Sequence, residues 1–193
     1  MEKENIPFEC LTFQEQISYL FDSIYRMFID DWLLEMSEKK YYGEAFHRLG
    51  YRVELLWKEV KEYRRSFFRR KAKRYKIEQL LFIVGDLALL MLYGHRRTED
   101  ARRVDVVEKT RAFFIEKLSQ KNRQYGDGNL LKHGLVGILV RLDDKLARIE
   151  NYLETGNIGE ESMDEVFFDI AGYALNALRL LKEGRLSIGG DVL

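Results

Sequence analysis

The chain has 193 residues, of which 46% are hydrophobic and 33% charged, enough for one soluble domain with a sizeable core or for two small ones. Basic and acidic residues number 32 each, and the resulting net charge of zero gives no overall attraction to nucleic acid or to a membrane surface. A single cysteine, Cys10, excludes an internal disulfide, and three scattered histidines exclude a zinc-type cluster, so we expect a cytoplasmic protein.

Helical patterning dominates the sequence. Residues 1–5 are charged and polar, which is not the pattern of a signal peptide. The most apolar run, 80–93, is interrupted by Gly85 and Asp86 and is too short to span a bilayer, so a buried helix explains it better and no membrane partner is expected. Only one proline, Pro7, occurs, and long segments repeat apolar residues at intervals of three and four. The sequence therefore predicts an all-α protein with six main helices.

Three of these helices are predicted in the first half of the chain, residues 1–95. The first helix extends over 12–41, and the second follows a turn between Gly43 and Gly50. The third, 77–93, directly follows the second and is nearly all apolar. A helix without a polar face is expected at the centre of the molecule.

The last part of the second helix, 58–76, is strongly basic and is opposed only by Glu59 and Glu62. Cations interleaved with aromatic residues are typical of proteins that hold single-stranded nucleic acid. The alternative is a solvated helix end whose aromatics face the core. Because the net charge is zero, we expect the run to pair with the acidic stretch 143–165 or to bind a triphosphate, and nucleic acid is not the expected partner. The cations are Lys58, Lys61, Arg64, Arg65, Arg69, Arg70, Lys71, Lys73, Arg74 and Lys76, and the aromatics are Tyr63, Phe67, Phe68 and Tyr75.

The second half, residues 96–193, begins with a polar link that ends at Arg103. Helices are predicted at about 104–124, 133–153 and 162–183, the last opened by a capping box of Ser162 and Glu165. The glycine-containing tail, with Gly184, Gly189 and Gly190, is expected to be loosely ordered.

The two halves can be aligned as a diverged tandem repeat of three-helix units packed around a pseudo-twofold axis. The first copy lacks acidic residues of the second, because Val60 and Phe82 stand where the second has Asp144 and Asp169. Chance agreement between two amphipathic units of similar length is the alternative. The aligned positions are Tyr42, Gly43, Gly50, Lys61, Arg64, Glu78, Ile83 and Gly85 with Tyr125, Gly126, Gly134, Lys145, Arg148, Glu165, Ile170 and Gly172.

Charged residues at helical spacing mark the second half as the functional one. Glu165 and Asp169 lie one turn apart on the last helix, and Asp169 sits among apolar residues, so it needs a cation or a metal as partner. Carboxylates facing each other from two helices are how helical bundles build divalent-metal sites. The alternative is a set of exposed ion pairs and helix-start charges. The preceding helix presents on one face Arg141, Asp144, Lys145 and Arg148.

Two segments of the second half carry these residues, and they read KNRQYGDGNLLKHGLVGILVRLDDKLARIENYL and ESMDEVFFDIAGYALNAL. Over about residues 117–183 the chain resembles the nucleotide-modification-associated domain 1 family, a branch of the all-α NTP pyrophosphatase (MazG-like) group. It departs from the family at Gly172, where Asn is usual, and in the order of Asp164 and Glu165. The residues that carry the resemblance are Tyr125, Gly126, Arg141, Asp144, Lys145, Arg148, Asp169 and Tyr173.

The resemblance implies a nucleotide pyrophosphohydrolase that splits a nucleoside triphosphate into the monophosphate and pyrophosphate with Mg²⁺ or Mn²⁺. Asp144, Glu165 and Asp169 would hold the metal and be catalytic. Related pyrophosphatases assemble from several chains, so a homodimer is expected. The nucleotide would be held by Lys121, Asn122, Tyr125, Arg141, Lys145, Arg148 and Tyr173.

Another class of function stays open beside this one. If the carboxylates have become structural, the chain is a non-catalytic helical module that senses nucleotides or forms oligomers. A nucleic-acid-binding helical protein is the third alternative, and it would use residues 58–76.

Overall fold

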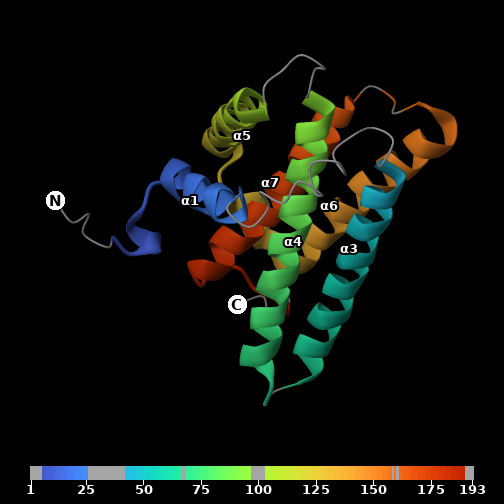
Figure 1. Cartoon of the computed structure of the whole chain (residues 1–193). Coiled ribbons are helices and arrows are strands. Elements are labelled where there is room, and N and C mark those ends of the chain that lie inside the picture. The colour runs from blue at the N-terminus through green and yellow to red at the C-terminus, as the bar shows by residue number, and fades with distance from the viewer. Residues whose placement is uncertain are drawn as a thin grey trace.

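The structure is a computed structural model that describes residues 6–25, 42–66, 68–96, 103–157, 159 and 161–189. Over these ranges it contains six α-helices, one short 3-10 helix and no strand (Figure 1). The predicted all-α class is confirmed. The elements are η1 (Phe8–Cys10), α1 (Phe13–Tyr25), α3 (Tyr42–Arg65), α4 (Arg70–Arg96), α5 (Arg103–Tyr125), α6 (Gly128–Thr155) and α7 (Met163–Lys182).

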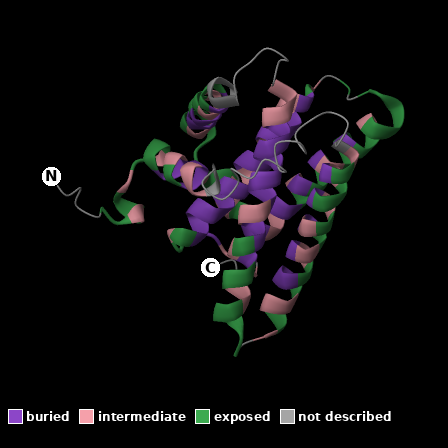
Figure 2. Ribbon diagram, viewed as in Figure 1, coloured by how far each residue is buried: buried purple, intermediate pink, exposed green. Residues whose placement is uncertain are grey.

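Two helices, α4 and α7, form the centre of the core (Figure 2). Buried side chains surround α7 from Met163 to Leu181, and most of α4 between Ile77 and Leu92 is buried as well. Helices that are apolar on all sides need cover on all sides. The cover comes from α3 against α4, from α6 against α7 and α3, and from α1 and α5, which contact each other and the central pair. Both halves of the chain therefore contribute to one hydrophobic core.

The central helix α4 is also the one described helix that is long and apolar enough to cross a membrane. In the structure, 67% of its most apolar window is buried inside the protein. The core helix of a soluble protein has the same length and composition, so this helix alone is weak support for a membrane span.

The contacts between helices are similar in the two halves of the predicted repeat. Exchanging α1, α3 and α4 with α5, α6 and α7 leaves the main pairs in place, since α3 packs on α4 as α6 packs on α7, and α4 meets α7 at the centre. This arrangement is compatible with two three-helix units, and the pseudo-twofold relation itself stays a prediction. Because α4 and α7 cover each other within one chain, their apolar surfaces do not require a second copy, and the homodimer also stays a prediction.

Two predicted boundaries in the first half are wrong. Gly43 and Gly50 both lie inside α3, so no turn separates them. The second and third helices are separated at 66–69, not at 76–77. The apolar spacing continues across this reversal, and neither glycine nor proline marks it, so the sequence reads as one helix where the chain forms two.

The second half contains a kink that the sequence also missed. α6 begins at Gly128, and Gly134 interrupts it with a φ of 57° and a ψ of −157°. A Cβ at Gly134 would lie 2.7 Å from the backbone oxygen of Ser187, and the Leu135 amide donates a hydrogen bond to that oxygen at 2.9 Å. The kink therefore joins α6 to the residues after α7.

The predicted loose tail is consequently corrected as far as Gly189. Leu186 and Ile188 are buried in the core, next to the Ser187 contact with α6. The remaining tail residues, 190–193, lie outside the described part of the chain, as do residues 26–41 of the predicted first helix.

Candidate functional site

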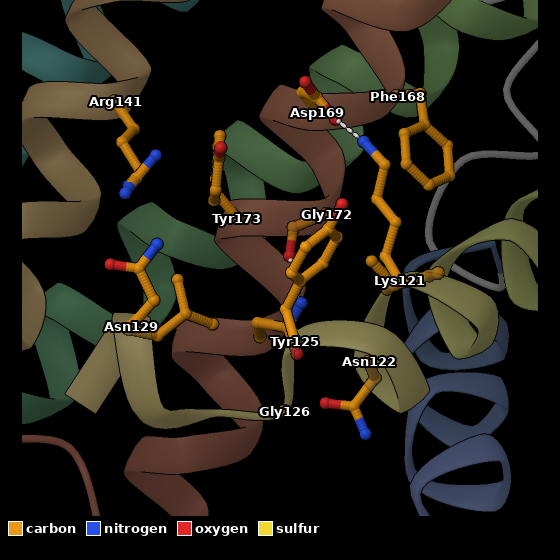
Figure 3. Close-up of a pocket in the computed structure, with 13 residues that line it drawn as sticks. Lys121, Asn122, Tyr125, Gly126, Asn129, Arg141, Phe168, Asp169, Gly172 and Tyr173 are labelled. Atoms are coloured by element: carbon orange, nitrogen blue, oxygen red, sulfur yellow. Dashed lines mark hydrogen bonds and ion pairs between the residues drawn. The ribbon is translucent and has the colours of Figure 1, made fainter.

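A pocket of about 350 Å³ lies where the end of α5 and the start of α6 meet the middle of α7 (Figure 3). Its walls combine two cations, one carboxylate, three amides and a set of aromatic and apolar side chains. The lining residues are Leu118, Lys121, Asn122, Tyr125, Gly126, Asn129, Leu130, Arg141, Phe168, Asp169, Gly172, Tyr173 and Asn176.

Two glycines shape this pocket. Gly126 has a φ of 57° and ends α5, and its amide donates a hydrogen bond to the carbonyl of Asn122 at 2.7 Å. Such a left-handed residue is a common helix end, and it turns the chain towards α6. On α7, a Cβ at Gly172 would lie 3.2 Å from a methyl carbon of Leu118. A larger side chain there would press on α5, which accounts for glycine at this position.

The carboxylate of Asp169 lies between two lysines at one wall of the pocket. Lys121 Nζ donates to Asp169 Oδ1 at 2.6 Å, and Lys145 Nζ lies 2.8 Å from Oδ2. The side chain of Asp169 is only 14% exposed. Burial acts to raise the pKa of Asp169, but the hydrogen bonds and charges of the two lysines outweigh it and hold the pKa below its ordinary value. Asp169 is therefore ionised, and the predicted need for a cation partner is confirmed.

The ion pairs continue away from the pocket through Glu161. Lys145 Nζ donates to Glu161 Oε1 at 2.6 Å, and Arg148 donates to Oε2 at 2.7 Å. Burial acts to lower the pKa of Lys145, but its hydrogen bonds to Asp169 and Glu161 raise it above the ordinary value. Lys145 and Arg148 thus contact protein carboxylates and do not line the pocket, which corrects their predicted place beside the nucleotide.

Glu161 itself was not singled out from the sequence. It lies in the loop before α7, where helical spacing says nothing about direction. The available signal was indirect, since two cations that point inward on α6 require a carboxylate partner.

Arg141 has no carboxylate partner among the described residues. Its guanidinium carbon lies 5.8 Å from the ring centre of Tyr173, and the side chain extends into the pocket towards Asn129 (Figure 3). Across the pocket stand Lys121 and, at its exposed rim, Tyr125. This cation is available to an anion that enters the pocket.

The predicted metal site does not fit the structure. Asp144 is exposed on α6, and of the three predicted ligands only Asp169 lines the pocket. Glu165 accepts a hydrogen bond from the Ser162 amide at 3.4 Å, as the predicted capping box requires, and lies 3.6 Å from Lys117. Mg²⁺ and Mn²⁺ need several oxygens, and no described group of three acidic, histidine or cysteine side chains could hold a metal ion.

The orientation of α6 around its own axis explains why Asp144 does not face Asp169. Asp144 and Lys145 are adjacent, so their side chains point about 100° apart around the helix. Lys145 takes the buried direction towards Asp169, which turns Asp144 to solvent. The predicted convergence of Asp144, Glu165 and Asp169 is therefore wrong.

No protein-family model matches the chain, and no curated protein or solved structure matches it either. The resemblance to the nucleotide-modification-associated domain 1 family stays a prediction.

Proposed function

We propose that the chain is a non-catalytic module that binds a nucleotide in the pocket between α5, α6 and α7. The observation that supports it is the convergence of five of the seven residues expected to contact a nucleotide. They come from three helices and line one pocket: Lys121, Asn122, Tyr125, Arg141 and Tyr173.

The chemistry of the walls suits a nucleotide. A volume of about 350 Å³ falls within the usual range for small-molecule sites. Arg141 offers a planar set of donors that matches a phosphate, and Lys121 adds a second charge from the opposite wall. Tyr125 offers an exposed ring for stacking, and the amides of Asn122 and Asn129 can donate to and accept from a base edge.

Hydrolysis finds less support in the same residues. Phosphoryl transfer of this kind depends on metal ions that neutralise the developing charge. Both oxygens of Asp169 contact ammonium groups, and neither Asp144 nor Glu165 lines the pocket. Asp169 and Glu165 have structural contacts, and Asp144 is exposed, which favours nucleotide sensing over turnover.

Calorimetric titration with nucleoside mono-, di- and triphosphates and with pyrophosphate tests the proposal. We expect binding by at least one nucleotide and a loss of affinity in Arg141→Gln. Arg123→Gln is the matched control, since this exposed arginine lies outside the pocket. Ligand at a hundredfold excess over its Kd should stabilise the fold by about 2.7 kcal/mol.

Two results would count against the proposal. Binding that is unchanged in Arg141→Gln would place the nucleotide elsewhere, and no binding by any nucleotide would overturn the function. Incubation with Mg²⁺ or Mn²⁺ and chromatography of the products should show intact triphosphate. Release of pyrophosphate, lost in Asp169→Asn, would instead favour the predicted hydrolase.

A further inference from the structure

The turn that joins α3 to α4 forms a basic tip, defined here as residues 58–76 apart from Phe67. Figure 1 shows this end of the two helices projecting beyond the rest of the bundle, and Figure 2 shows that much of it is exposed. Arg74 donates a hydrogen bond to the carbonyl of Leu181 on α7, and Glu59 and Val60 are buried, whereas most of the other side chains of the tip are exposed. This position makes the charge of the tip available to a partner.

Only part of that charge is neutralised within the protein. Lys73 and Lys76 pair with Glu59, and Lys73 also pairs with Glu62. Arg74 pairs with Glu78 at 2.9 Å. No described carboxylate forms an ion pair with the other exposed cations of this group, which are Lys58, Lys61, Arg64, Arg65, Arg69 and Lys71.

The expected pairing with the acidic stretch 143–165 is therefore wrong for the described residues. That stretch has other partners. Asp143 accepts a hydrogen bond from the Trp57 indole at 2.8 Å, and Asp164 lies 2.6 Å from His95 and 3.0 Å from Arg96. Glu161 and Glu165 contact cations of the second half. The zero net charge of the chain thus hides a basic end that its acidic residues neutralise only in part.

Aromatic side chains accompany the exposed cations. Phe68 is 98% exposed and Tyr75 is 63% exposed, so these two rings do not face the core. Tyr63 packs against the core, as the alternative interpretation required. Lys61 lies 5.9 Å from the ring centre of the half-buried Trp57. Exposed rings thus lie in the same part of the chain as cations that have no ion pair with a described carboxylate, the two kinds of group that hold a single strand.

The groups are arranged as a stripe along the hairpin. Trp57, Lys61 and Arg65 follow one another at intervals of four on one face of α3. Together with Lys58 and with the carboxylates of Glu54 and Glu62 they line a shallow hollow, in which cations outnumber carboxylates by three to two. Eight residues of helix extend about 12 Å, so a strand that follows α3 would bring more than one phosphate within reach of these cations. A membrane would meet the projecting end at Phe68, whereas Lys58 lies about 10 Å before the end of α3 at Arg65. The stripe therefore fits a strand better than it fits a lipid surface.

We propose that the basic tip binds single-stranded nucleic acid, with its cations on the phosphates and its exposed aromatics stacked on bases. This contact is independent of the nucleotide pocket. It would be largely insensitive to base sequence, because stacking and phosphate contacts do not read base edges.

Fluorescence anisotropy with the full chain and a labelled oligothymidylate of about 20 nucleotides tests the proposal. Removing three phosphate contacts of the stripe, in Lys58→Gln with Lys61→Gln and Arg65→Gln, should reduce the slope of log affinity against log salt by about 2. At about 0.15 M salt this corresponds to a loss of roughly 50-fold. Phe68→Ala should weaken binding by at least about fivefold.

The matched control removes three exposed cations elsewhere, in Lys109→Gln with Arg123→Gln and Lys132→Gln, and should leave the affinity nearly unchanged. Arg141→Gln should also bind the oligonucleotide normally, which separates this site from the pocket. Equal losses in the tip and control triples, or no binding at all, would overturn the proposal. Tighter binding to duplex DNA would contradict the single-strand form, and binding to phosphatidylserine vesicles without the oligonucleotide would identify a membrane contact instead.

Discussion

Asp169 on α7 and Asp86 on α4 are both carboxylates on the central helices, yet their surroundings differ. The Asp169 side chain is 14% exposed and lies between the ammonium groups of Lys121 and Lys145. Asp86 is 3% exposed, and no described residue forms a hydrogen bond or an ion pair with it. Burial therefore raises the pKa of Asp86 to about 8, while the pKa of Asp169 is below its ordinary value.

A helical core can accept a carboxylate in two ways. A carboxylate taken out of water either finds cations or becomes neutral, because an isolated buried charge is costly. The α7 aspartate has cations on both oxygens and lies beside a pocket, whereas the α4 aspartate is neutral at pH 7. The same residue type is thus ionised on α7 and protonated on α4.

The largest expected effect comes from Asp86→Asn. Asp86 ionises in the unfolded chain near pH 3.8 but in the folded chain only near pH 8, so wild-type stability falls as the pH rises between these values. Asparagine removes this titration. Asp86→Asn should match the wild type near pH 4 and be more stable by on the order of 4 kcal/mol at pH 7. Denaturant unfolding at both pH values measures the difference, and a variant that is less stable at pH 7 would show that Asp86 has a stabilising partner.

The same substitution at Asp169 should have the opposite sign. Asp169→Asn leaves Lys121 and Lys145 without their shared carboxylate, and breaking a buried ion pair from one side costs about 3 kcal/mol or more. Stability that depends on Asp169 is present above its unfolded pKa of 3.8 and is lost as the pH falls below it, since the folded pKa is lowered. Denaturant unfolding at pH 7 should therefore show a large loss. A loss no greater than that of Glu154→Gln, which removes an exposed carboxylate of α6, would mean that the lysines are satisfied without Asp169.

The sequence predicted which helix lies at the centre of the core, but it predicted fewer of the contacts between charged residues. The apolar run 80–93 was enough to place a helix at the centre, and the apolar neighbours of Asp169 were enough to demand a cation. The choice between Asp144 and Lys145 as the inward residue was not readable, because helical spacing allowed either one. It depends on a rotation of α6 by one residue, which packing against α7 decides.

The positions of turns, kinks and loop side chains were predicted least well from the sequence. The reversal at 66–69 lies inside a continuous apolar pattern, so the sequence predicted the basic run 58–76 as the end of one helix and not as the turn between two. The kink at Gly134 depends on contact with Ser187, more than fifty residues later, and local sequence does not report such contacts. Glu161 lies in a loop, where side-chain direction has no period.

The smallest expected effect separates the two lysines that hold Asp169. Lys145 is 10% exposed and joins Asp169 to Glu161, whereas Lys121 is 41% exposed and stands at the pocket wall. Lys145→Met should cost about 2 kcal/mol of stability, because Asp169 and Glu161 both lose the buried cation that they share. Lys121→Met should cost less than about 1 kcal/mol, since a half-exposed pair is screened by water.

For nucleotide affinity we expect the reverse order, with the larger loss in the Lys121 variant. Lys121 can reach a ligand phosphate in the pocket and Lys145 does not line it, so Lys121→Met should weaken nucleotide binding while Lys145→Met, measured well below its unfolding temperature, should retain it. Calorimetric titration and denaturant unfolding of the two variants give the four values needed. If Lys145→Met loses affinity as well, Asp169 is positioned for the nucleotide by Lys145, and the division between a structural and a ligand-facing lysine fails.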